Sequence, residues 1–294
     1  MKQRTITAVI FAALFTAFFL PAYWFPITAV LMSLIVGAVV IYELIKALKH
    51  GGYDPSTSLI VTGCVISILI LTGGYFLKIT AENALALYVM LIGMFTLACG
   101  ILLPVSRKDD SKALENGIAT GGTIFYVTFP LFCMNAAMLL LPEECNGWYY
   151  MLVGLVAPWI SDVFAYLVGV TMGKHKIVPH ISPKKTWEGC IGGAFFCALG
   201  VMIYSCLVIY KVDNLSMNLV AFAVMTFFMG LLVSVMSQLG DWFASVIKRH
   251  VGIKDYGNIF PGHGGMLDRF DSTFFTMPIG LLLAIVAQLF SKGV

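Results

Sequence analysis

Long runs of apolar residues make up most of the chain, and short polar segments separate them. A helix needs roughly 20 apolar residues to cross the hydrocarbon core of a bilayer. The runs therefore predict an all-α integral membrane protein with about nine transmembrane helices. The windows are Ile6–Trp24, Ile27–Leu48, Leu59–Leu77, Ala84–Leu103, Gly117–Leu141, Trp148–Met172, Cys190–Tyr210, Met217–Leu239 and Phe274–Phe290.

The composition supports this interpretation, because 60% of the residues are hydrophobic and only 11% are charged, against roughly 25% in soluble domains. The first window follows two basic residues, as a signal peptide would. No small-residue cleavage site follows it and eight more windows do, so we expect it to be retained. The seven cysteines contain no Cys-x-x-Cys pair, which favours small core residues over a disulfide frame or a zinc site.

The positive charges give the predicted helices an orientation. When the connecting segments are assigned alternately to the two sides, 15 of the 18 Lys and Arg residues fall on one side. The positive-inside rule makes that side cytoplasmic, which puts the amino terminus inside and the carboxyl terminus outside. The net charge of +3 suits anionic headgroups or phosphates, and no segment is typical of a nucleic-acid-binding arm.

The chain divides into two regions of different character. Residues 1–141 hold about five windows that are almost free of ionisable groups, whereas residues 142–294 hold about four windows and two charged cytoplasmic loops, 173–189 and 240–272. Glu43 lies near the cytoplasmic end of the second window, and we expect a local interfacial pair with Lys46 and no further role. Because ionisable groups are costly in a membrane, we expect the carboxyl-terminal region to hold the active site.

Asp162 lies in the middle of the sixth window. An ionised carboxylate facing lipid there would cost several kcal/mol, so we expect it to face protein or water. Ser161, Ala165 and Gly169 follow the helical spacing of a small and polar stripe that can pack against other helices. Two interpretations stay open for Asp162: a structural bond between helices, or direct participation in a site.

The loop after this window contains the run SPKKTWEG, Ser182 to Gly189. Lys184, Lys185 and Thr186 supply two ammonium groups and a hydroxyl, as an anion-binding turn requires, and phosphate is the obvious anion. We expect Glu188 to pair with a lysine. Lysines beside a membrane also serve as simple topological determinants, so the lysines alone are weak evidence. The complete run, with Glu188 placed to pair with a lysine, favours the functional interpretation.

The second charged segment begins at Asp241, directly after the eighth window. We expect the helix to continue into the cytoplasm, which would place Ser245, Lys248 and Arg249 on the same face as Asp241. Glycines around His263 would let the backbone approach a phosphate, although short glycine-rich turns are common. The acidic and basic residues Lys254, Asp255, Asp268, Arg269 and Asp271 complete the segment.

Asp241 and Asp268 could reach a common point if the eighth and ninth windows lie side by side. Two carboxylates among several cations are suited to Mg²⁺ and a polyphosphate, and phosphoryl or nucleotidyl transfer needs mostly positioning and charge neutralisation. His263 has no second His or Cys at ligand spacing, which disfavours zinc. The chain contains neither a P-loop nor a Gly-x-Ser-x-Gly elbow.

The segment SVIKRHVGIKDYGNIFPGHGGMLDRFD, Ser245 to Asp271, resembles the signature of the phosphatidate cytidylyltransferases, also called CDP-diacylglycerol synthases. The SPKKTWEG run and the pair Asp162 and Tyr166 are also similar to that family. The resemblance covers the chain from about Pro158 onward. One position departs from it: the family often has Glu where this chain has Ala244, so no carboxylate role carries over there.

The resemblance implies transfer of a cytidylyl group from CTP to phosphatidate in phospholipid biosynthesis, at the cytoplasmic face of a bacterial inner membrane. It implies Mg²⁺ held by Asp241 and Asp268, allows a second cation such as K⁺, and allows a homodimer. The implied catalytic residues are Asp241, Asp268, Lys248 and Arg269. The implied substrate-binding residues are Ser182, Lys184, Lys185, Thr186, Glu188, Ser245, Arg249, Lys254, Asp255, His263, Gly264, Gly265, Asp271, Asp162 and Tyr166.

Two alternatives remain at this point. A related membrane cytidylyltransferase or kinase could act on another lipid, since the headgroup chemistry is shared. A transporter of an anionic solute would suit the number of helices and the buried aspartate. Transporters usually show repeated halves with broken helices, whereas the charge of this chain collects on one side.

Overall fold

In a computed structural model, the described residues are 13, 15–108, 110–142, 145–178, 182–260, 262 and 264–290, with only the backbone at 183 and 184. Within them, eight helices are long and apolar enough to cross a membrane. They confirm the predicted all-α membrane fold and coincide with eight of the nine windows. In the first window, Ile6–Trp24, residues 6–12 and 14 lie outside the described residues, as do Lys2, Arg4 and Lys292.

The helices differ from the windows mainly in length. They are α2 (Ile27–His50), α3 (Thr57–Phe76), α4 (Ala81–Ser106), α5 (Ala113–Leu139), α6 (Gly147–Met172), α9 (Leu219–His250) and α10 (Leu267–Gln288). The helix at the seventh predicted window is composite, formed by α7 (Trp187–Tyr204), the π-helical turn η2 (Ser205–Ile209) and α8 (Tyr210–Val212). A short 3₁₀ turn, η1 (Pro21–Tyr23), precedes α2. Strands β1 (Lys176–Val178) and β2 (Ser182–Thr186) pair antiparallel, with Lys176 opposite Thr186.

Polar side chains mark where several helices begin. Ser56, Thr80 and Thr186 precede α3, α4 and α7, and each accepts a hydrogen bond from a backbone N–H in the first turn. Asn146 does the same before α6. Such caps satisfy N–H groups that have no partner within the helix, which matters most where water is scarce.

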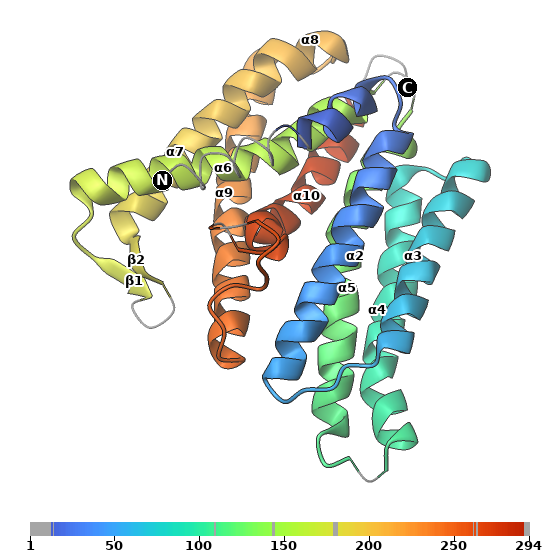
Figure 1. Cartoon of the computed structure of the whole chain (residues 1–294). Helices are drawn as coiled ribbons and strands as arrows, with labels where there is room; N and C mark the ends of the chain where they lie inside the picture. The colour runs from blue at the N-terminus through green and yellow to red at the C-terminus, as the bar shows by residue number, and fades with distance from the viewer. Residues whose placement is uncertain are drawn as a thin grey trace. The chain divides into compact units, whose positions relative to one another are not determined.

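The chain forms two compact units. The first contains the described residues up to Leu140 together with Ile247–Phe270. In it α5 packs against α2, α3 and α4, and these four helices lie side by side (Figure 1). A Cβ placed at Gly117 would lie 2.6 Å from the carbonyl oxygen of Cys99, so a glycine there lets α5 approach the backbone of α4.

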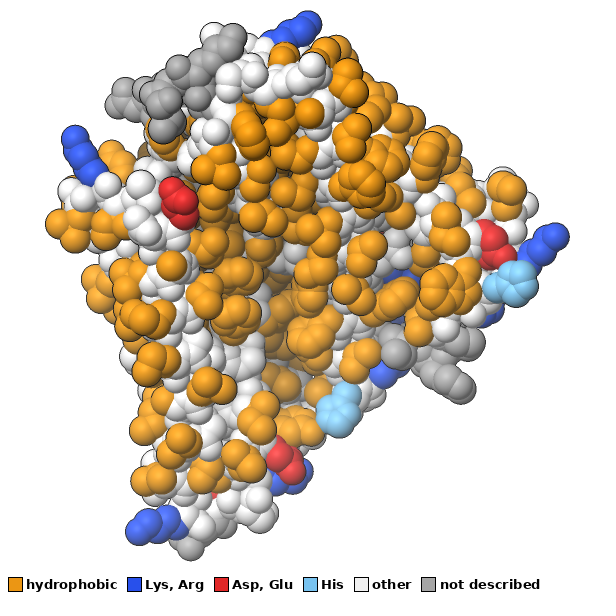
Figure 2. Space-filling model, turned by 180° about the vertical axis from the view of Figure 1, so that it is seen from behind, with side chains coloured by type: hydrophobic (Ala, Val, Ile, Leu, Met, Phe, Trp, Pro, Cys, Tyr) orange, Lys and Arg blue, Asp and Glu red, His pale blue; other side chains and the backbone are white. Residues whose placement is uncertain are grey.

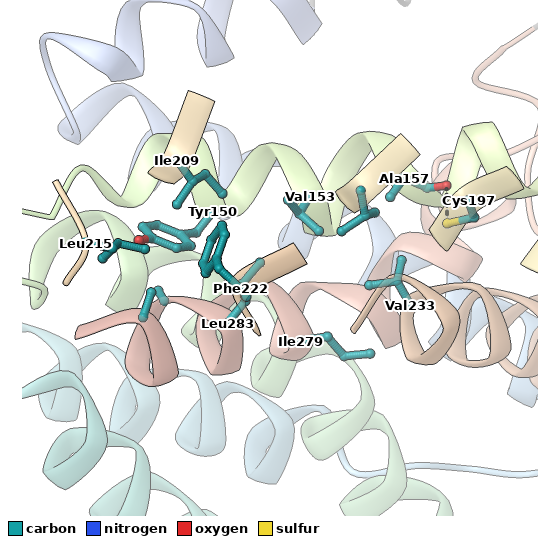
Figure 3. Close-up of a cluster of buried hydrophobic side chains, with 13 residues drawn as sticks. Tyr150, Val153, Ala157, Cys197, Ile209, Leu215, Phe222, Val233, Ile279 and Leu283 are labelled. Carbon is teal, nitrogen blue, oxygen red and sulfur yellow. Dashed lines mark hydrogen bonds between the residues drawn. The ribbon is translucent and has the colours of Figure 1, made fainter. Parts of the chain in front are cut away.

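The second unit contains Leu141–Val246 and the described residues from Asp271 onward. In it α6 packs against α7, and the β1–β2 hairpin joins them (Figure 1). A buried cluster that includes Tyr150, Cys197 and Phe222 fills the space between α6, α7, α9 and α10 (Figure 3). Small residues again allow close contact, because a Cβ at Gly230 on α9 would lie 2.6 Å from the Cα of Ala198 on α7.

Hydrophobic side chains cover much of the protein surface, as Figure 2 shows for one face. Leu97 of α4 and Phe76 of α3 are among the most exposed. An exposed apolar surface of this extent would drive a soluble protein to aggregate, and it matches the hydrocarbon of a bilayer instead. All seven cysteines are free and are buried or half-buried, as the sequence predicted.

We expect Gly230→Ala to lower the apparent melting temperature of the detergent-purified protein by several degrees. The new methyl group would force α7 and α9 apart, and overpacking of this kind costs about 1–3 kcal/mol. Gly200→Ala is the matched control, because the nearest side-chain atom to its Cβ would lie at an ordinary contact distance of 3.7 Å. Equal melting temperatures for the two variants would contradict the close helix contact.

Candidate functional site

A buried carboxylate lies at the start of α10. The side chain of Asp268 is only 4% exposed, and its Oδ1 accepts a hydrogen bond of 2.8 Å from the ammonium of Lys248. Its Oδ2 accepts two more from the backbone N–H groups of Tyr256, at 2.8 Å, and Gly265, at 2.9 Å. The Lys248 ammonium also lies over the ring of Tyr256, 5.4 Å from its centroid. We call Lys248, Tyr256, Gly265 and Asp268 the Asp268 cluster.

The turn before Asp268 depends on glycine. Gly264 has a φ of +86°, a conformation that other residues adopt only with strain. A Cβ at this position would also lie 2.7 Å from Oδ2 of Asp268. The backbone of Gly264 forms a bridge with Phe260, whose N–H donates to the Gly264 carbonyl at 3.0 Å. The glycine-rich turn is therefore shaped around the carboxylate.

Glu43 is the residue that the sequence interpretation missed. Lys46 does act on Glu43 electrostatically, but the predicted interfacial position is wrong, because Glu43 is only 2% exposed and faces the start of α10. Its two carboxylate oxygens accept hydrogen bonds of 2.9 Å from the backbone N–H groups of Met266 and Leu267. The cost of an acid inside an apolar window was the available signal, and the nearby lysine offered a simpler explanation.

Helix α9 extends from Leu219 to His250, which confirms that the eighth predicted helix continues past Leu239. Lys248 points to Asp268, whereas Arg249 is exposed and its Nη1 reaches the carbonyl oxygen of Ile253 at 3.4 Å. At the end of the helix, Nε2 of His250 lies 2.7 Å from the hydroxyl of Tyr53. Ser245 is half-buried.

A second group of charges lies in the other compact unit. Lys185 forms an ion pair with Asp241, and its ammonium lies 5.6 Å from the ring centroid of Trp242. Lys185 and Asp241 also act electrostatically on Asp162. We call Asp162, Lys185, Asp241 and Trp242 the Asp241 cluster. Asp162 is exposed at the protein surface and interacts with charged partners, so its facing protein or water stays a prediction.

The run from Ser182 to Thr186 is strand β2, and the expected turn is wrong. Between α6 and α7 the chain must reverse, and pairing with β1 satisfies backbone groups that would otherwise lack partners. The expected pairing of Glu188 with a lysine side chain is also wrong. Its carboxylate lies 2.6 Å from Nδ1 of His175 and accepts from the backbone N–H groups of Lys174 and His175. Glu188 is in the first turn of α7, and from there its side chain reaches the backbone just before β1.

The remaining candidates have varied surroundings. The Nε of Arg269 is buried and has no hydrogen-bond partner among the described residues, and Asp271 is buried, with Oδ1 accepting from the N–H of Ser272. Lys254 and Asp255 are exposed, and Tyr166 is 69% exposed. His263 and the side chain of Lys184 lie outside the described parts of the chain.

The two proposed metal ligands belong to different compact units, Asp241 to one and Asp268 to the other. No group of three or more His, Cys, Asp or Glu side chains that could hold a metal is found in the described residues. Mg²⁺ takes one or two carboxylates and fills its other positions with water and substrate phosphates, so the chemistry of these two side chains fits it. A shared ion stays a prediction.

Comparison with known proteins places this geometry in context. The model of the cytidylyltransferase family matches residues 2–287. The phosphatidate cytidylyltransferase of Thermotoga maritima is 34% identical over 242 residues, which are 75% of this chain and 86% of that protein. The protein of the same name from Staphylococcus haemolyticus is 32% identical over 292 residues, 97% of this chain and 99% of that one. A third, from Mycobacterium bovis, is 31% identical over 255 residues, 86% and 77% of the two chains.

Proposed function

Because the chain belongs to the cytidylyltransferase family, we propose that it transfers a cytidylyl group from CTP to phosphatidate, giving CDP-diacylglycerol and pyrophosphate. The observation that carries the proposal is the Asp268 cluster, in which Lys248 and Asp268 of the family signature meet at 2.8 Å. The helices that could cross a membrane make it a multi-pass membrane protein, which suits an enzyme whose substrate is a membrane lipid.

The chemistry is a substitution at phosphorus. A phosphate oxygen of phosphatidate attacks the α-phosphorus of CTP, a new P–O bond forms, and the bond from that phosphorus to the bridging oxygen breaks. Pyrophosphate leaves with the electron pair. The phosphatidate oxygen is already anionic at neutral pH, so the reaction needs no strong general base, and stabilisation of developing charge is the main task.

The charged side chains are suited to that task. Lys248 and Lys185 each balance a carboxylate, and the buried Nε of Arg269 leaves one donor for a phosphate oxygen. We propose that Asp241 and Asp268 hold Mg²⁺. When bound, Mg²⁺ offsets the negative charge of the CTP phosphates and of the departing pyrophosphate. Asp162 acts on Lys185 electrostatically, and we infer that it helps to orient this lysine.

We also propose that the site opens to the cytoplasm of a bacterial cell, where CTP is made. The segregation of 15 of the 18 basic residues to one side supports this orientation, and the relatives named above are bacterial. A second cation such as K⁺ and a homodimer stay predictions.

The detergent-purified protein is expected to release pyrophosphate only when CTP, phosphatidate and Mg²⁺ are all present. Pyrophosphate release and radiolabel transfer from CTP to lipid should rise together. A polyprenol and an ether-linked phosphatidate analogue test the alternative lipids. A higher kcat/KM with one of these than with phosphatidate would overturn the proposed substrate.

Asp268→Asn is expected to lower kcat by about 100-fold or more, since loss of one group that stabilises transition-state charge typically costs about 10²–10³. The variant keeps the shape of the side chain but puts an amide where Lys248 needs an anion. Glu82→Gln, at an exposed position in the first turn of α4, controls for the loss of one negative charge. Near-normal turnover by folded Asp268→Asn protein would refute the role of this carboxylate.

Gly264→Ala and Gly252→Ala form a matched pair of variants. Together they distinguish the effect of backbone strain from the effect of displacing the Asp268 side chain. Both glycines have positive φ, +86° and +75°, so each substitution should cost roughly 1–2 kcal/mol in stability. A Cβ at Gly264 would press on Asp268, whereas no atom lies within 4 Å of a Cβ at Gly252. Turnover should therefore fall only in Gly264→Ala, and equal turnover in the two variants would argue against the shaped turn.

A further inference from the structure

The carboxylate of Glu43 is held against the segment that carries Asp268, although the two residues are far apart in sequence. Glu43 lies on α2, and its partners Met266 and Leu267 are 223 and 224 positions later in the chain. All three residues belong to the same compact unit. Lys46 acts on this carboxylate electrostatically, and the carboxylate accepts its hydrogen bonds from the two backbone N–H groups. Burial of a carboxylate is costly, so we ask what its position here provides.

The backbone around Glu43 is shaped to receive it. A Cβ at either Gly257 or Gly265 would overlap Oε1 of Glu43. The carboxylate therefore occupies a space that exists only because both positions are glycine. Two stretches of the signature segment, one before the glycine-rich turn and one at its end, thus lie against the same side chain.

Three successive backbone N–H groups are divided between two acids. Gly265 donates to Asp268, and Met266 and Leu267 donate to Glu43, all at 2.9 Å. These groups are at the N-terminus of α10, which begins at Leu267, where N–H groups lack partners within the helix and negative charge is favoured. A shift of Glu43 would move the same short backbone segment that holds Asp268.

We propose that Glu43 is a positioning residue for cytidylyl transfer: it clamps the backbone from Gly265 to Leu267 and so fixes the Asp268 carboxylate. Glu43 and Asp268 also repel each other electrostatically, and the clamp acts through the N–H groups of the turn. This inference rests on the proposed function and assigns a role in the reaction to a helix of the amino-terminal half.

The test compares Glu43→Gln with Tyr88→Phe. Gln keeps the size of the side chain but can accept only through one oxygen, so one N–H of the turn loses its partner. Tyr88→Phe is the control, because Tyr88 is fully buried in the same unit and its hydroxyl lies 2.6 Å from that of Thr128 on α5. Both variants lose one buried hydrogen bond, and only Glu43→Gln touches the turn.

Glu43→Gln is expected to lower kcat at least tenfold with a smaller change in KM for CTP, and to raise the Mg²⁺ concentration for half-maximal rate. A misplacement of about 1 Å can cost on the order of 100-fold in rate. Amide hydrogen exchange, measured without substrate or metal, should be faster in peptides that cover residues 264–270. Tyr88→Phe should change neither kcat nor the exchange rates of these peptides, even if the melting temperatures of the two variants fall equally.

The proposal is overturned if Glu43→Gln keeps the wild-type kcat and exchange rates, or if Tyr88→Phe loses activity to the same degree. If Glu43→Gln does not fold, Gly257→Ala presses on the same carboxylate from the backbone side and is judged by the same two measurements. Product formation by the wild-type protein is scored separately, so failure of the clamp leaves the proposed reaction standing. If the wild-type protein is inactive, the proposed reaction is contradicted. The exchange rates of Glu43→Gln then test by themselves whether Glu43 holds the turn.

Discussion

The structure around the candidate site depends on how the N-terminus of α10 is satisfied. N–H groups at the start of a helix have no partner within it. Here Glu43 and Asp268 accept from three successive N–H groups, those of Gly265 and Met266 just before the helix and that of Leu267, its first residue. Helix N-termini favour negative charge, and low exposure to water strengthens the effect. The same bonds that complete the helix therefore orient an acid that the family signature contains. Structural and chemical requirements coincide in one short segment.

Each of the two charge clusters contains an ion pair between a lysine and an aspartate. Lys248 pairs with Asp268 in one compact unit, and Lys185 pairs with Asp241 in the other. Unpaired charges would be expensive so close to hydrocarbon, whereas paired ones can exchange partners when an anion and a cation arrive together. A substrate that brings phosphates and a divalent ion offers both partners. The two lysine–aspartate pairs are therefore better suited to nucleotidyl transfer than to transport of an anion that carries no cation with it.

Eight membrane helices could be predicted from the sequence because crossing a bilayer requires long apolar runs, and that requirement is local. The continuation of α9 to His250 and the proximity of acids and bases in the signature segment were also within reach. Glu43 was not, because its partners are more than 200 positions away and Lys46 gave a local explanation. The strand at Ser182–Thr186 was missed because proline and two lysines favoured a turn, whereas pairing with β1 decided the conformation. Contacts between distant segments have no periodic signal.

The division of the chain gives the amino-terminal helices more than an anchoring role. Ile247–Phe270 belongs to the same compact unit as α2 to α5, although it comes from the carboxyl-terminal part of the sequence. Contacts within that unit include Tyr53 with His250 and Gly51 with Val251, where a Cβ at Gly51 would lie 2.7 Å from a methyl carbon of Val251. Glu43 adds the clamp on the turn. Helix α9 begins in one unit and ends in the other, so it carries Asp241 of one cluster and Lys248 of the other on continuous backbone. Changes in the amino-terminal helices can therefore act on catalysis without touching either substrate.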